Sequence, residues 1–183
     1  MTEQVVAVDP VWVIDAMCLS HFVRAERLDV LRDLLVDKEC WTTQVVLEEL
    51  RQGTAAHPAL RDVVVADWLK VARLDTLDEI RLFTIWAGRL GSGERDLGEA
   101  SVFAAAELRS ATAITDDPGP VRVARTHGLD AHGTIWLLAG ACRDGKLSEA
   151  AAGNLVDALR ATGLRLPCTG AEFPSYARQH GLL

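Results

Sequence analysis

The chain has 183 residues, of which 49 % are hydrophobic and 25 % charged, and its formal net charge is −7. This composition is typical of one globular domain with a sizeable core, and it excludes a disordered chain. The negative charge argues against a protein that holds nucleic acid by bulk electrostatics, because phosphate contacts come from lysine and arginine. It is compatible with an enzyme whose anionic pocket is neutralised by divalent cations.

Two further classes are not expected. No apolar stretch approaches the roughly 20 residues of a membrane helix, and the N-terminus has no basic region of the kind that opens a secretory signal. A cytoplasmic location is therefore expected. The four cysteines are widely separated and form no CxxC, which favours reduced thiols over a disulfide or zinc framework.

Short apolar, β-branched segments are expected to form the strands. The first ends at Asp15 and shows no polar alternation, as expected of a buried parallel strand with both faces covered. The expected strands are residues 11–16, 39–43, 68–74 (at an edge of the sheet), 111–115, 129–131 and, as a possible last strand, 165–166.

Helical periodicity fills the intervals between these strands. The expected helices are residues 19–35 with a break near Arg27, 44–51, 58–66, 77–90, 99–109, 118–127, 134–143 and 148–162. Thr42 or Thr43 would cap the helix 44–51, and Gly53 would end it. The tail from Pro167 is expected to be irregular.

Strands that alternate with helices along one chain predict a three-layer α/β/α sandwich with a central, mostly parallel sheet. We expect one domain that spans residues 1–183. In such sheets ligands bind at the carboxyl ends of the strands, where the strand order reverses. A candidate site should therefore lie at that edge.

Five acidic residues are expected near this edge. Asp15 follows the first strand, and Asp116 and Asp117 follow the strand 111–115. Glu49 and Glu99 are expected in the first turns of two helices that face the same edge. Because Mg²⁺ and Mn²⁺ prefer oxygen ligands, a group of carboxylates without His or Cys suits these ions.

Each acid taken singly also has an ordinary structural interpretation. An Asp at a strand end often caps the next helix, and a Glu in a first turn complements the helix dipole. The run Asp116-Asp117-Pro118 would also make a turn. The recurrence of acids at one edge of the sheet is what favours a functional cluster.

Four motifs, in chain order, resemble those of PIN domains. Residues 13–22 (VIDAMCLSHF) resemble the opening of that family, in which the first strand delivers the first metal-binding Asp, here Asp15. Residues 42–53 (TTQVVLEELRQG) resemble the second motif. They place its acid on Glu49, with Glu48 as the alternative.

The third and fourth motifs complete the set. Residues 97–106 (LGEASVFAAA) resemble the third motif and assign its acid to Glu99. Residues 113–117 (AITDD) resemble the fourth and assign its acid to Asp117, with Asp116 as a neighbour and possible co-ligand. Further segments, ARTHGL, GTIWLL and DGKL, are similar to an extended PIN subgroup of predicted nucleic-acid-binding proteins.

The resemblance implies a metal-dependent endoribonuclease. Asp15 and Asp117 would bind one or two Mg²⁺ or Mn²⁺ ions directly, and Glu49 and Glu99 would bind through water or position the nucleophile. Substrate contacts are considered for four basic side chains, although solvated surface is the simpler interpretation for each. They are Arg51, Arg95, Arg122 and Lys146.

Many compact members of the family are VapC-like toxins that bind a small antitoxin and are commonly dimeric, so the resemblance makes an antitoxin partner and a homodimer candidates here. The apolar tracts 77–86 and 136–141 are candidate interface surfaces, and core burial explains them equally well.

The sequence departs from the family at one position. PIN domains usually have Ser or Thr after the first Asp, whereas Ala16 stands there, and Ser20 is the nearest substitute in the next turn. A second hypothesis is therefore a PIN-like module that binds RNA or a protein without cutting. A third, a nucleotide-binding or phosphatase-type enzyme, has only the loop 91–93 in its favour, since there is no GK[ST] and no GxGxxG after a strand.

Overall fold

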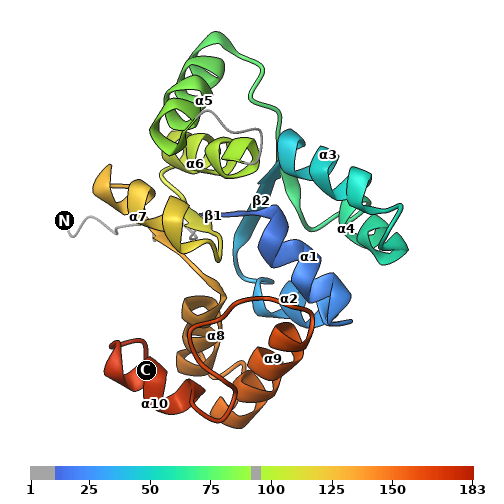
Figure 1. The fold of residues 1–183 in the computed structure, drawn as a ribbon, viewed down its shortest axis with the longest axis vertical. Helices are drawn as coiled ribbons and strands as arrows, with labels where there is room; N and C mark the ends of the chain where they lie inside the picture. Colours follow the sequence, from blue (N-terminus) through green and yellow to red (C-terminus); the bar gives the residue numbers. More distant parts are fainter. Residues whose placement is uncertain (1–10, 92–95) are drawn as a thin grey trace, which may run out of the picture.

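The computed structural model describes residues 11–91 and 96–183 (Figure 1). In these residues five strands form one sheet in the order β3-β2-β1-β4-β5, and every pairing is parallel. The strands are β1 (Val11–Ile14), β2 (Glu39–Thr43), β3 (Lys70–Ala72), β4 (Thr112–Ile114) and β5 (Ala131–His132). The expected α/β fold with a parallel sheet is confirmed, and so is the edge position of the strand in residues 68–74.

Helices follow the strands as expected, including the break between residues 24 and 28. They are α1 (Ala16–Arg24), α2 (Leu28–Leu34), α3 (Gln44–Gly53), the 3₁₀ turn η1 (Pro58–Leu60), α4 (Arg61–Val64), α5 (Leu77–Leu90), α6 (Leu97–Arg109), α7 (Pro118–Thr126), α8 (Thr134–Arg143), α9 (Glu149–Ala161) and α10 (Phe173–Gln179). No helix in residues 11–91 and 96–183 is long and apolar enough to cross a membrane.

The sheet topology determines where a ligand can bind. From β1 the chain runs outward through β2 to β3, and it returns on the other side of β1 as β4 and then β5. The strand order therefore reverses between β1 and β4, and the carboxyl ends of these two strands flank the switch point. The two ends are joined directly, since the Asp15 amide donates to the Ile114 carbonyl at 3.0 Å.

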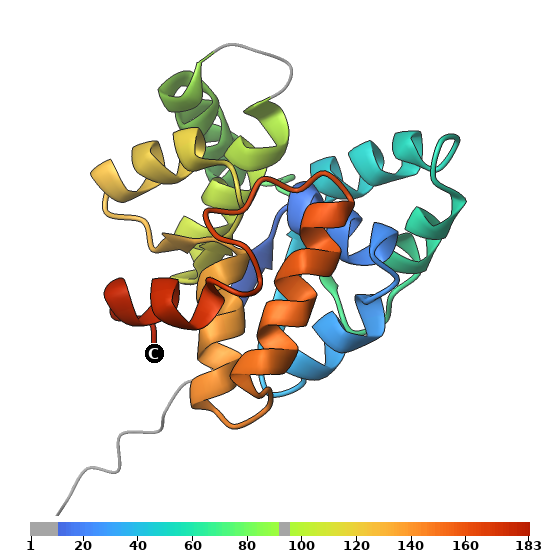
Figure 2. The ribbon, with the colours of Figure 1, turned by 60° about the horizontal axis from the view of Figure 1, so that its bottom comes forward.

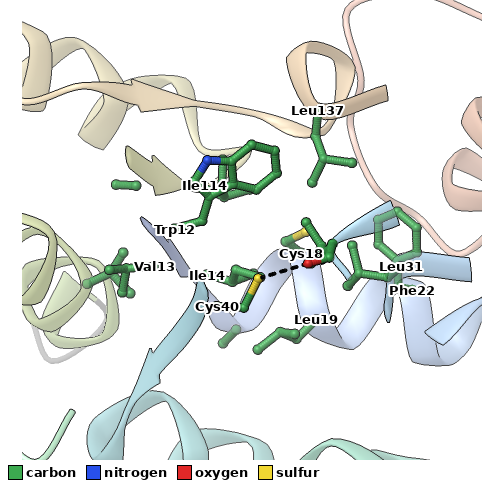
Figure 3. Close-up of a cluster of buried hydrophobic side chains, with 14 of the residues drawn as sticks. Trp12, Val13, Ile14, Cys18, Leu19, Phe22, Leu31, Cys40, Ile114 and Leu137 are labelled. Carbon is green, nitrogen blue, oxygen red and sulfur yellow. Dashed lines mark hydrogen bonds between the residues drawn. The ribbon is translucent and has the colours of Figure 1, made fainter. Parts of the chain in front are cut away.

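The core fills both faces of the sheet. Helix α6 packs on β1, β2 and β4, with α5 behind it (Figure 1). Side chains of α1, α2 and α8 gather on the other face around Ile14, where Leu19, Phe22, Leu31 and Leu137 are almost completely buried (Figure 3). Because successive residues of a strand point to opposite faces, β1 needs apolar residues on both, as its continuous apolar run predicts.

The C-terminal region differs from the expectation of an irregular tail. Residues 173–179 form α10, which packs on α8 and α9 (Figure 2). Phe173 and Ala177, four residues apart, are both fully buried, so tertiary packing stabilises a helix too short to stand alone. The expected strand 165–166 is absent from this described region. Arg160 instead binds this segment through the carbonyl of Leu166 at 2.9 Å.

The two tracts considered as interfaces have different environments. In residues 136–141 the side chains of Leu137 and Leu138 belong to the core. Along α5, Trp86 is buried, whereas Leu77 and Ile80 are exposed. Core burial therefore explains the tract 136–141, and α5 keeps an apolar outer surface.

Two helical glycines should respond in opposite ways to the same substitution. A Cβ on Gly153 in α9 would lie 2.6 Å from the Gly170 carbonyl oxygen, whereas a Cβ on Gly88 in α5 would meet nothing within 4 Å. We expect Gly153→Ala to lower the free energy of unfolding by about 1–3 kcal/mol through overpacking. Gly88→Ala should raise it by up to about 1 kcal/mol through helix propensity. Urea denaturation measures both, and equal effects would contradict the close approach of α9 to residue 170.

Candidate metal-binding and active site

Asp15 lies at the centre of the candidate site. It follows β1 and caps α1, and its Oδ2 accepts hydrogen bonds from the Met17 amide and from Thr115 Oγ1, both at 3.2 Å. Only 3 % of the residue is exposed. Asp15 therefore does cap a helix, as the ordinary interpretation of an Asp at a strand end predicts. It is also buried at the switch point of the sheet.

Thr115 donates a hydrogen bond to Asp15, although residue 16 carries no hydroxyl group. It follows β4 directly, is fully buried, and donates to Asp15 from the neighbouring strand. Ser20, the substitute considered from sequence, instead donates to the Met17 carbonyl at 3.1 Å. Sequence reasoning missed Thr115 because the contact joins residues 100 positions apart.

Glu49 and Glu48 point to different surroundings. Glu48 forms an ion pair with Arg51 at 3.3 Å on the exposed side of α3. Glu49 instead lies near Asp15, and desolvation raises its pKa. The expectation that Glu49 stands in a first helical turn is wrong. Because Thr43 caps α3 and the helix begins at Gln44, this residue is in the second turn.

Gly98 at the start of α6 brings two of the carboxylates close to one point. A Cβ built on Gly98 would lie 3.0 Å from Glu49 Oε2 and 3.8 Å from Asp15 Oδ1. Any larger residue here would place a carbon atom against both acids. The absence of a side chain at this position therefore keeps the space between the carboxylates open.

A chain of buried hydroxyl groups fixes α3 and α6 relative to each other. The Val46 amide donates to Thr43 Oγ1 at 3.1 Å, and Ser101 Oγ donates to the Gly98 carbonyl at 2.7 Å. Thr43 Oγ1 and Ser101 Oγ are 2.6 Å apart. Because the Ser101 hydroxyl already donates its proton to the Gly98 carbonyl, Thr43 is the donor in this hydrogen bond. These contacts hold the helices that carry Glu49 and Glu99. The Thr43 cap of α3 was expected, whereas the contact of Thr43 with Ser101 was not.

Glu99 is the acid most affected by its neighbours. It lies in the first turn of α6, as expected, and is half-buried. Desolvation, together with the charges of Asp15, Glu49 and Asp117, raises its pKa to about 7. The pKa of Asp15 rises to about 6, mainly through burial and further through Glu49. Four acids from four parts of the chain thus share one electrostatic environment.

Asp117 and Asp116 face opposite sides of the β4 end. Asp117 caps α7 by accepting from the Gly119 amide at 2.8 Å, and its charge acts on Glu99. Asp116 accepts from the Thr134 amide at 2.7 Å and from Thr134 Oγ1 at 2.5 Å, which directs both of its oxygens to the start of α8. Of the two, Asp117 belongs to the acidic cluster and Asp116 to the contact with α8.

The basic residues considered for substrate binding are dispersed. Arg51 pairs with Glu48, and Arg122 is exposed on α7. Arg95 lies outside the described residues. Lys146 holds Asp37 at 2.8 Å and the Leu34 carbonyl at 3.0 Å, which gives it a structural role.

The acids fit a divalent cation by their chemistry. Asp15, Glu49 and Glu99 line a cavity of about 300 Å³, and none of them forms an ion pair with a base in the described part of the chain. Within residues 11–91 and 96–183 no three potential ligands already stand in metal-binding geometry. A cation would therefore draw these side chains together from their present positions.

The fold and this cluster define the class of protein: a parallel α/β domain with an acidic site at its topological switch point. A family model described as a PIN domain (DUF3368) matches residues 11–171. The chain therefore belongs to the PIN-domain family and has a nuclease-type fold. A comparison with curated proteins found no match.

The raised pKa of Asp15 predicts a pH-dependent stability for the metal-free protein. The folded state holds this proton with a pKa of about 6, against an ordinary value of 3.8. Proton binding by Asp15 therefore adds to the free energy of unfolding. This contribution is fully present below the ordinary pKa of 3.8 and is lost as the pH rises through the folded-state pKa of about 6. Asp15→Asn keeps an oxygen for Met17 and Thr115, so we expect it to stabilise the metal-free protein at about pH 8 by on the order of 3 kcal/mol.

Denaturation of both proteins in a chelator, at about pH 5 and about pH 8, measures this effect. Wild type should lose more stability than Asp15→Asn between the two conditions. Identical losses would show that Asp15 carries no such penalty.

Proposed function

We propose that this chain is a ribonuclease that hydrolyses RNA phosphodiester bonds with bound Mg²⁺ or Mn²⁺. The observation that carries the proposal is the cluster of Asp15, Glu49, Glu99 and Asp117 at the switch point of the sheet. Burial, together with the charges of neighbouring acids, raises the pKa of Asp15 and of Glu99, and none of the four acids pairs with a base among the described residues. Such a site suits a cation. Membership of a family with a nuclease-type fold supports the same conclusion.

Each acid has a separate place in this proposal. Asp15 and Asp117 would bind the ion directly, and Glu49 and Glu99 would position the attacking water or bind through water. Thr115 holds Oδ2 of Asp15, and Oδ1 lies toward Gly98 and the cavity. A bound divalent ion would supply a lower pKa for its water and would stabilise the charge on the leaving oxygen.

The competing function is an RNA- or protein-binding module of the same family that does not cut. Ala16 and the net negative charge motivated that alternative, and the hydrogen bond from Thr115 orients Asp15 without a hydroxyl group at residue 16. A small antitoxin and a homodimer stay predictions of the resemblance, for which exposed Leu77 and Ile80 offer apolar surface. Light scattering of the purified protein, alone and with a protein encoded beside it, would test both.

Cleavage of a panel of structured RNAs tests the proposal directly. We expect cleavage that needs Mg²⁺ or Mn²⁺ and that falls by about two orders of magnitude or more in Asp15→Asn and Asp117→Asn. Glu48→Gln is the matched control, because Glu48 is a neighbouring acid that pairs with Arg51, and it should retain activity. Full activity in both Asp variants would exclude the mechanism, and RNA binding without cleavage would favour the binding module.

Thermal unfolding provides a test that does not depend on the RNA chosen. A cation that binds only the folded state stabilises it by about 2.7 kcal/mol at 100 times its Kd, so Mn²⁺ should raise Tm. Asp15→Asn should begin at a higher Tm in chelator, because repulsion is relieved, and should gain much less from Mn²⁺. NaCl at equal ionic strength is the control. Equal gains in wild type and variant would argue against a cation site at Asp15.

A further inference from the structure

A second, larger cavity borders the acidic cluster on the β5 side of the sheet. It measures about 700 Å³ and is lined by residues that include Thr115, Arg125, His132, Trp136, Arg165 and Tyr176. Tyr176 of α10 and residues 165–167 of the segment before it form part of its lining. Thr115, which donates to Asp15, lies at the border between this cavity and the acidic cluster.

Aromatic rings on one side of the cavity form a column. Trp12 packs on Trp136 with ring centres 5.4 Å apart, and Trp136 stacks on His132 at 4.1 Å with only 10° between the ring planes. Trp136 and His132 line the cavity, and Trp12 supports them from the core side. His132 is the last ring of this column.

Hydrogen bonds fix the plane of the His132 ring and its tautomer. Nε2 lies 2.8 Å from Asp130 Oδ1, which can only accept, and Nδ1 lies 3.3 Å from Arg125 Nη2, which can only donate. Nε2 therefore carries the proton. Burial lowers the pKa of His132, so the ring is neutral at neutral pH. Asp130 and Arg125 occupy the two ring nitrogens, and Trp136 covers one face. The second face of this flat, neutral ring is left for the cavity.

Two arginines add positive charge beside these rings. Arg125 and Arg165 both line the cavity and are exposed, and neither pairs with a carboxylate in residues 11–91 and 96–183. Arg125 donates hydrogen bonds to the Ala131 carbonyl and to His132 but keeps its positive charge. Flat rings beside guanidinium groups that form no ion pair suit a ligand that has a π-face and a negative charge. A nucleotide has both.

We propose that this cavity receives one unpaired nucleotide of the RNA substrate, with its base stacked on His132 and its phosphate near Arg165. The inference rests on the proposed function, since it assigns the substrate a position beside the acids. A base within a double helix already has both faces stacked, so the cavity selects single-stranded RNA or a flipped-out base. A peptide would match the apolar surface but would make no use of the terminal ring.

RNA binding in a chelator tests the proposal without cleavage. Fluorescence anisotropy with a labelled single-stranded oligoribonucleotide should show about tenfold weaker binding for His132→Leu. His132→Phe is the matched variant, because it loses the same contacts with Asp130 and Arg125 but keeps an aromatic face. We expect it to bind nearly as tightly as wild type.

A second pair of variants tests the charge. Arg165→Gln should lower the slope of log K against log salt by about 0.7, the value for one phosphate contact on a single strand. Arg61→Gln, an exposed arginine on α4, should leave the slope unchanged. The same RNA annealed to its complement should bind wild type more weakly.

The outcomes separate this proposal from the nuclease proposal. Equal affinity for His132→Leu, His132→Phe and wild type would overturn the nucleotide cavity, even if cleavage depends on Asp15. RNA binding that requires an aromatic ring at residue 132, without any metal-dependent cleavage, would support the proposed nucleotide site and overturn the proposed nuclease function. If both hold, His132→Leu should raise KM about tenfold with little change in kcat.

Discussion

Burial of a carboxylate at the end of β1, with other carboxylates beside it, is the constraint on which much of this structure depends. Asp15 is almost inaccessible to solvent, and the charge of Glu49 adds to the effect of burial on its pKa. Burial and the charges of Asp15, Glu49 and Asp117 likewise raise the pKa of Glu99. Hydrogen bonds from Met17 and Thr115 offset only part of the cost of burying Asp15, since its pKa stays raised. The protein thus bears an electrostatic penalty at its switch point, which a bound cation would relieve.

The surroundings of the acids hold them in place despite this repulsion. The hydroxyl chain through Thr43 and Ser101 ties the start of α3 to the start of α6, and Gly98 leaves the space between the acids open. These supports come from β2 and from the first turn of α6, so the acids stand on rigid elements rather than on loops. The backbone positions of the acids are therefore set by the fold, and a bound cation would need to move only their side chains.

The sequence predicted the sheet, most helices and the acids, because those features leave local signals. A continuous apolar run ending in Asp15 has few interpretations, and the motif around Glu99 repeats a known pattern. The partners of the acids left no such signal, since Thr115 meets Asp15 only after β1 and β4 pair. Helix α10 was missed for a related reason: only seven residues long, it depends on Phe173 and Ala177 reaching the core.

The contact between Arg125 and β5 has a consequence for the outer edge of the sheet. The carbonyls of Asp130, just before β5, and of His132 accept from the amides of Ala113 and Thr115, so the Ala131 carbonyl between them points away from the sheet. Arg125 covers it with two hydrogen bonds, at 2.9 and 2.7 Å. An open carbonyl on an edge strand is a template for pairing with another chain. The same side chain that borders the 700 Å³ cavity therefore makes this carbonyl of β5 unavailable for pairing with another chain.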